Sequence, residues 1–153
     1  MNTEATGQGQ APTGRVVVGI DGSEGSNRAL EWAATEASRS GAVLEVHASY
    51  GPGYVFVTPH EVEQAMQRLL DDAVEHIHGV APGVALTGVI QQGSAAQSLI
   101  EASKGADLLV VGSRGRGGFS GLLLGSVSQQ CSLHAHCPIV IVRPPEDQID
   151  KAA

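Results

Sequence analysis

The sequence contains little cysteine and few aromatic side chains: two cysteines in 153 residues, and 3% aromatic residues. Two cysteines are too few for a secreted fold held by disulfides, so Cys131 and Cys137 are expected to be reduced thiols. No apolar run approaches the roughly 18 residues of a membrane span, and residues 1–14 lack the apolar core of a signal peptide. We therefore expect a cytoplasmic protein with no membrane contact.

Positive charge is also scarce. Lysine and arginine total 9 against 16 acidic residues, and the formal net charge is −7. Binders of nucleic acids usually carry a basic field over a broad face, so no nucleic-acid partner is expected. The length and the 42% hydrophobic content fit one globular domain. We place this domain at residues 15–143, between flexible polar tails at 1–14 and 144–153.

Three common motifs of nucleotide-binding proteins and hydrolases are missing. The sequence contains no Gly-x-x-x-x-Gly-Lys-Ser/Thr, which excludes the usual phosphate-binding loop with its lysine. A Gly-x-Gly-x-x-Gly pattern that begins at Gly115 and Gly117 is interrupted by Ser120. No Gly-x-Ser-x-Gly nucleophile elbow occurs either. Any nucleotide site in this chain is therefore of another kind.

Short apolar runs alternate along the chain with amphipathic segments of helical length. The runs predict strands at residues 15–20, 43–49, 84–91, 107–111 and 138–143. A capping box at Thr58 and Glu61, with proline at the first helical position, predicts the start of one intervening helix. Strands that are buried on both faces and joined by crossovers form parallel sheets. The predicted fold is α/β, a single open, doubly wound, five-stranded parallel sheet with helices on both faces.

A glycine-rich loop follows the fourth predicted strand. It reads Gly-Ser-Arg-Gly at residues 112–115, then nine residues, then Gly-Ser at 125–126, where a helix over 126–135 is predicted to begin. Glycine permits positive φ and close approach to a ligand, and the N–H groups at a helix start attract anions. Residues 108–145 contain three arginines and no acidic residue. These features predict a phosphate-binding loop.

Asp21 directly follows the first predicted strand, as Gly112 follows the fourth. Ligands of doubly wound sheets bind beyond the carboxyl ends of the strands, where the strand order reverses. If these two strands are neighbours, both residues border one crevice. Asp21 has an alternative interpretation, because an aspartate before Gly22 can simply form a turn that caps the next helix.

Taken in order, these motifs resemble the ATP-binding branch of the universal stress protein family. The resemblance covers about residues 15–143 and includes the opening Val-Gly-Ile-Asp-Gly-Ser, His47 in the second strand, and Gly93 before the third helix. It continues with Gly-x2-Gly-x9-Gly-Ser and ends with Cys-Pro-Ile-Val-Ile-Val. The complete ordered set is far more specific than three glycines alone.

The resemblance implies a site for ATP with Mg²⁺ or Mn²⁺. By position, Asp21 would bind the ribose hydroxyls or help to hold the metal, and the backbone at Ala48 would contact the adenine edge. Val111 and Gly112 would line the nucleoside pocket. The phosphate-binding residues would be Arg114, Gly115, Gly125, Ser126 and Val127.

The resemblance also implies the sheet order 3-2-1-4-5, which makes the first and fourth strands neighbours. The last strand, from Pro138 to Arg143, would then lie at a sheet edge and join two copies in a homodimer. No motif identifies the regulatory protein partner that would recognise the bound state.

No residue is assigned a catalytic role. Efficient phosphoryl transfer needs a metal, a charge clamp and a residue that orients the nucleophile, and Asp21 is the one evident carboxylate near the predicted phosphates. The favoured function is a nucleotide-dependent regulatory or stress-response protein with little or slow ATP turnover. Alternatives are a genuine ATPase or phosphotransferase, a cyclic-nucleotide-binding protein, and an interaction module that needs no nucleotide.

Two further sites are disfavoured. The cysteines and histidines between Cys131 and Cys137 lack the paired spacing of structural zinc modules, so no metal site is expected there. The Arg-Gly segment at 114–118 has no stacking aromatic residue beyond Phe119, which argues against RNA binding.

Overall fold

The computed structural model describes residues 11–51, 58–115 and 123–145, in which strands and helices alternate. The elements in chain order are β1 (Arg15–Ile20), α1 (Glu24–Ser40), β2 (Val43–Tyr50), α2 (Pro59–Val80), β3 (Leu86–Gln92), α3 (Ala95–Ala102), β4 (Leu108–Gly112), α4 (Ser126–His134) and β5 (Ile139–Val142). The outer parts of both predicted tails, and the loop residues Gly117, Phe119 and Ser120, lie outside the described residues.

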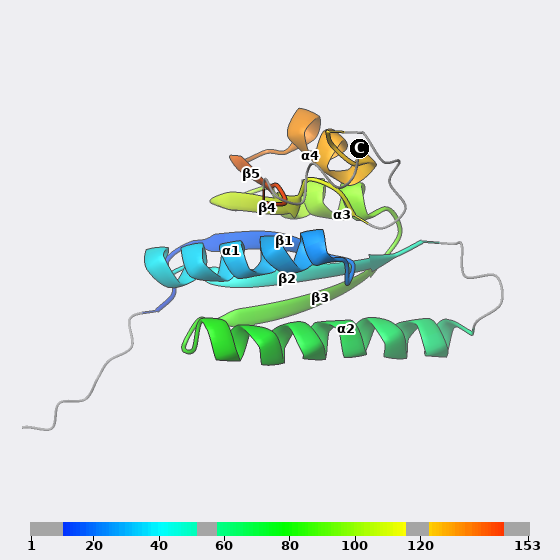
Figure 1. Cartoon of the computed structure of the whole chain (residues 1–153), viewed down its shortest axis with the longest axis horizontal. Helices are drawn as coiled ribbons and strands as arrows, with labels where there is room; N and C mark the ends of the chain where they lie inside the picture. The colour runs from blue at the N-terminus through cyan, green and yellow to red at the C-terminus, as the bar shows by residue number, and fades with distance from the viewer. Residues whose placement is uncertain (1–10, 52–57, 116–122, 146–153) are drawn as a thin grey trace, which may run out of the picture.

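The five strands form one parallel sheet in the order β3-β2-β1-β4-β5. In Figure 1 the blue β1 therefore lies between the cyan β2 and the yellow-green β4, out of chain order. The predicted fold class and the predicted strand order are both confirmed. Because the order reverses between β1 and β4, the carboxyl ends of these two strands mark the expected place for a ligand.

Helices cover both faces of the sheet and form two cores. One core joins the sheet to α1 and α2, and Leu30 of α1 is among its buried residues. The other joins the sheet to α3 and α4, and Leu99 of α3 is among its buried residues. Successive side chains of a strand point to opposite faces, so Val16 and Val18 of β1 belong to the first core and Val17 to the second.

The helix boundaries follow from local capping. The Ser23 hydroxyl accepts the N–H of Ser26 at the start of α1, and Gly41 ends this helix at a φ of 72°, a conformation that glycine adopts without strain. The predicted capping box of α2 is confirmed. The N–H of Thr58 donates to Oε2 of Glu61 at 2.7 Å, and the N–H of Glu61 donates to Oγ1 of Thr58 at 3.3 Å.

The ends of four strands differ from the prediction, and those of β2 and β4 differ by a single residue at any end. β3 begins at Leu86 instead of residue 84, and β5 is shorter than the predicted strand from Pro138 to Arg143. Pro138 has no N–H to donate to the ladder, although its carbonyl oxygen accepts the N–H of Leu109 at 3.0 Å. In the described part of the chain, no helix has both the length and the apolar character needed to cross a membrane.

Candidate functional site

A cavity of about 400 Å³ lies at the carboxyl ends of β1, β2 and β4, against the first turns of α3 and α4. It includes every predicted site residue except Ala48. The structure thus brings the end of the first strand and the glycine loop together at one place. Among the described lining residues, Asp21 is the only acidic side chain and Arg114 the only arginine or lysine.

Ala48 is separated from the cavity by the alternation of side chains along β2. Its side chain is fully buried in the core beneath α1 and α2. Its neighbours His47 and Ser49 point to the other face and line the cavity. The family resemblance implied only a contact between the Ala48 backbone and the adenine edge, and this contact remains a prediction.

The start of α4 presents backbone donors to the cavity. The first hydrogen bond of this helix runs from the N–H of Gln129 to the carbonyl oxygen of Gly125, at 3.0 Å. The N–H groups of the three preceding residues, Ser126 to Ser128, therefore belong to the unpaired first turn of a helix. All three residues line the cavity, and the positive end of the helix dipole lies with them. Such a helix start favours a bound anion.

The loop before α4 is fixed by bonds to Ser113. The N–H of Gly125 donates to the carbonyl oxygen of Ser113 at 2.7 Å, and the buried hydroxyl of Ser128 donates to the same oxygen at 2.8 Å. These two bonds connect the end of β4 with the first turn of α4. The donor groups at the helix start are consequently held in place before any ligand binds.

Close approach, and not positive φ, explains Gly112 and Gly115 of the loop. None of Gly112, Gly115 and Gly125 is among the glycines with positive φ, so that part of the sequence interpretation was wrong. An added Cβ at Gly112 would lie 2.8 Å from the carbonyl oxygen of Gly25 in α1. The same addition at Gly115 would lie 2.5 Å from Oδ2 of Asp21. Both distances are too short for a carbon atom, so a side chain at either position would displace its neighbour.

Asp21 forms the turn that the alternative interpretation predicted, but it is not the helix cap. Its Oδ1 accepts the N–H of Ser23 at 2.9 Å. The cap of α1 is Ser23. The carboxylate of Asp21 also lines the cavity beside Gly115. The turn therefore positions a carboxylate at the cavity, and the two roles are compatible.

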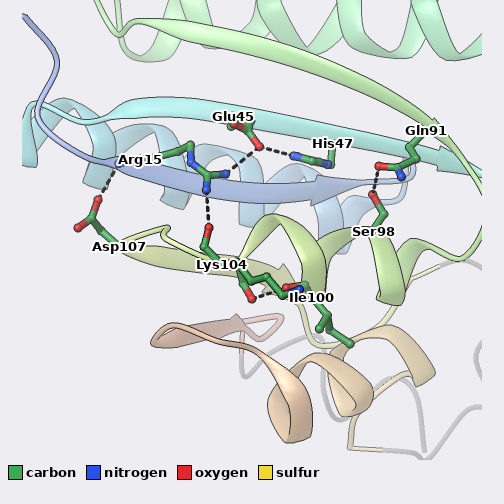
Figure 2. A network of polar contacts seen from close by, with 9 residues as sticks. Arg15, Glu45, His47, Gln91, Ser98, Ile100, Lys104 and Asp107 are labelled. Atoms are coloured by element: carbon green, nitrogen blue, oxygen red, sulfur yellow. Dashed lines mark hydrogen bonds and ion pairs between the residues drawn. The ribbon is translucent and has the colours of Figure 1, made fainter.

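A row of polar side chains on the α3 face of the sheet reaches the cavity at His47 and was not predicted from the sequence. Figure 2 shows Arg15, Glu45 and His47 in a line along β1 and β2. Arg15 Nη1 donates to Oε1 of Glu45 at 3.0 Å, and the same oxygen lies 2.6 Å from Nε2 of His47. The Glu45-x-His47 spacing in a mostly apolar strand was the available signal, because residues two apart share a face.

Cys131 packs in the hydrophobic core. It is fully buried in the cluster beneath α3 and α4, and burial raises the pKa of its thiol to about 11. A thiol with so high a pKa is a poor nucleophile and a poor metal ligand near neutral pH. Within the described ranges, no group of three histidine, cysteine or acidic residues is arranged to hold a metal ion.

Comparisons with known proteins agree with the fold. Residues 12–143 match the universal stress protein family. A universal stress protein of Thermus aquaticus is 37% identical over 136 residues, which cover 84% of this chain and 97% of that protein. A crystal structure of a universal stress protein in complex with cAMP superposes with a TM-score of 0.69 at 28% identity, covering 86% of this chain and 97% of the other.

Other relatives are longer than this chain. A universal stress protein of Mycobacterium tuberculosis is 37% identical over 142 residues, which cover 88% of this chain but only 46% of the relative. The chain thus spans about half the length of the mycobacterial relatives that it matches.

Proposed function

Because the chain belongs to the universal stress protein family, we propose that its cavity binds an adenine nucleotide, namely ATP with Mg²⁺ or Mn²⁺. The bound state would serve regulation in a stress response, with little or slow turnover. The relative solved with cAMP supports the nucleotide class.

One observation carries the proposal. The unpaired N–H groups at the start of α4 lie in the same cavity as the Arg114 side chain and the Asp21 carboxylate. The cavity lining divides into two chemical kinds: backbone donors and a cation at the glycine loop, and apolar side chains such as Leu99 and Ala95 of α3. A nucleotide has the same division, with charged phosphates at one end and a flat base at the other.

The metal has a fitting partner in Asp21. Mg²⁺ in nucleotide sites is commonly held by phosphate oxygens, waters and one or two carboxylates, so a dedicated protein cage is unnecessary. Asp21 lies beside Gly115 in the predicted phosphate loop. Bound metal would neutralise phosphate charge, and Asp21 would orient it from the β1 side.

Slow turnover follows from the groups at the cavity. Fast phosphoryl transfer needs a residue that orients the attacking oxygen in addition to the metal and a charge clamp. If Asp21 holds the metal, no second carboxylate remains among the described lining residues for that task. We expect turnover far below the ~1 to 100 s⁻¹ of kinases.

The decisive experiment is to denature freshly purified protein and identify any released nucleotide by mass. Calorimetry with ATP, ADP, cyclic AMP and adenosine should then rank ATP first. Equal affinities for ATP and adenosine would exclude phosphate recognition by the α4 start. Tighter binding of cyclic AMP than of ATP would favour the second candidate function, a cyclic-nucleotide-binding protein, which the cAMP complex of the relative supports.

We further propose a cytoplasmic homodimer. β5 lies at one edge of the sheet, and each of its residues is only partly buried. The unpaired backbone groups of such an edge can pair with those of a second copy.

A further inference from the structure

His47 contains the one buried side-chain atom of the described cavity lining that has no hydrogen-bond partner. Its side chain is only 6% exposed. The ring Nε2 lies 2.6 Å from Oε1 of Glu45, whereas Nδ1 has no partner among the described residues. A buried polar atom without a partner is costly, and a bound ligand is one way to satisfy it.

The Glu45 contact determines which kind of ligand atom can fill this role. A carboxylate oxygen only accepts hydrogen bonds, so Nε2 of His47 carries a proton, and the tautomer of the neutral ring with its proton on Nε2 is the one that fits this contact. Nδ1 is then an acceptor that lacks a donor. Arg15 holds the Glu45 carboxylate in place, as Figure 2 shows. Its Nη1 donates to Glu45, and its Nη2 donates to the carbonyl oxygen of Lys104 at 2.9 Å.

His47 lies on β2, which β1 separates from β4 and the glycine loop that follows it. It is paired in register with Gly19 of β1, where a side chain would meet Leu99 of α3 at 2.7 Å. The donors of the glycine loop and of α4 border the cavity from β4. A nucleotide whose phosphates lie at the start of α4 therefore directs its base toward β2 and His47.

We infer that His47 determines which base is accepted, with its Nδ1 taking a hydrogen bond from the exocyclic amino group of a 6-aminopurine. This inference rests on the proposed nucleotide function. A 6-oxopurine would place an acceptor opposite an acceptor. Nδ1 is covered by neighbouring atoms in the free protein, and a small ring movement of the kind common on ligand binding exposes it.

The test compares three triphosphates by calorimetry: ATP, purine riboside triphosphate, which has hydrogen in place of the 6-amino group, and ITP, which has oxygen there. The unmodified protein should bind purine riboside triphosphate roughly fivefold to tenfold more weakly than ATP, which is the effect of one hydrogen bond. ITP should bind more weakly still, because two acceptors oppose each other.

Two variants test whether Nδ1 of His47 causes the preference for ATP. His47→Leu fills a similar volume without an acceptor and should bind the three nucleotides with nearly equal affinity. His47→Asn can place its amide oxygen near the position of Nδ1 and should retain part of the preference for ATP. Thermal denaturation of both variants verifies that they fold, and the ratio of affinities within one variant is independent of any general loss of binding.

The outcomes separate this inference from the function on which it rests. Equal affinities in the unmodified protein, or an unchanged ratio in His47→Leu, would overturn the role of His47 while leaving nucleotide binding in place. Failure of all three triphosphates to bind would overturn both.

Discussion

Gly115 and the Asp21 carboxylate are in such close proximity that a Cβ at residue 115 would lie 2.5 Å from Oδ2 of Asp21. The glycine loop and the end of β1 are distant in sequence, and this contact joins them at the cavity. A substitution at Gly115 therefore acts on two parts of the site at once: it blocks the loop and displaces the carboxylate.

We expect Gly115→Val to weaken ATP binding by about tenfold to a hundredfold, comparable to the loss of one or two hydrogen bonds to a charged group. The free energy of unfolding should change little, because Gly115 borders the cavity and lies in neither core. Calorimetry and chemical denaturation measure the two effects. A folded Gly115→Val protein with unchanged affinity would contradict the assignment.

Gly79→Ala is the matched control for that variant. An added Cβ at Gly79 meets nothing within 4 Å, and the residue lies in α2, away from the cavity. Because alanine is favoured over glycine in helices, the free energy of unfolding should rise by about 0.5 kcal/mol. ATP affinity should stay the same, and a loss of affinity here would show that general perturbation, not loop geometry, explains the Gly115 result.

Asp21→Asn tests the metal role of the carboxylate. The amide keeps the size of the side chain and can still accept the Ser23 N–H, which forms the turn. The charge that attracts a divalent cation is lost, so affinity for ATP with Mg²⁺ should fall by about tenfold. Affinity for ATP in the presence of a chelator should stay the same or increase, because one repulsive negative charge is removed. Equal losses with and without Mg²⁺ would assign Asp21 to the nucleoside instead.

The strands could be predicted from the sequence because their signals are local, whereas their order in the sheet was implied by the family resemblance. The uninterrupted apolar strands and the Thr58–Glu61 capping box depend on neighbouring residues alone, and the structure contains both. The Gly-x2-Gly-x9-Gly-Ser spacing likewise identified the loop that borders the cavity.

The role of His47 could not be predicted from the sequence, because it depends on tertiary contacts. Its Nε2 is satisfied by Glu45 on the same strand, but the missing partner of Nδ1 depends on what α3 and β1 place around the ring. The backbone conformation of the loop glycines was also not predicted correctly from the sequence. Gly112 is required by the approach of Gly25 from α1, a contact that no local pattern encodes.

The tautomer of His47 can be measured directly. We expect proton attachment at Nε2 near neutral pH, because the neighbouring Glu45 oxygen at 2.6 Å can only accept. The nitrogen chemical shifts of the labelled imidazole distinguish the two tautomers. In Glu45→Gln the preference should weaken, since an amide can donate or accept. A predominant Nδ1-protonated form in the unmodified protein would remove the acceptor on which base selection depends.

Cys131 should make stability decrease in alkaline solution. Burial raises the pKa of its thiol from 9.0 to about 11, so the folded state retains a proton that the unfolded state releases. The stabilisation by the protonated thiol is complete below pH 9 and is lost as the pH rises toward 11, by about 3 kcal/mol in total. Denaturation curves across this range should show a steeper loss for the unmodified protein than for Cys131→Ala. Identical pH profiles would contradict the prediction.

The last prediction concerns β5 as the dimer contact. Val140 and Val142 pack partly against the core beneath α1, and Ile139 and Ile141 pack against the core beneath α4. β4 is the one strand paired with β5 in the described sheet. Two copies related by a two-fold axis can pair these edges antiparallel, which closes the assembly at two chains. Light scattering should therefore report twice the chain mass of 15.7 kDa.

Substitution at this edge should separate assembly from nucleotide binding. Val140→Lys places a charge at the proposed contact, and we expect it to shift the protein toward monomer or aggregate. Residues 139–142 do not line the cavity, so ATP affinity should be retained in the monomer. Leu133→Lys is the control, because Leu133 lies in α4 with 70% of its surface exposed and outside β5. If contact is confined to the β5 edge, this variant stays dimeric. An unmodified protein that remains monomeric at high micromolar concentration would exclude the dimer, because the exposed edge would then have no partner of its own kind.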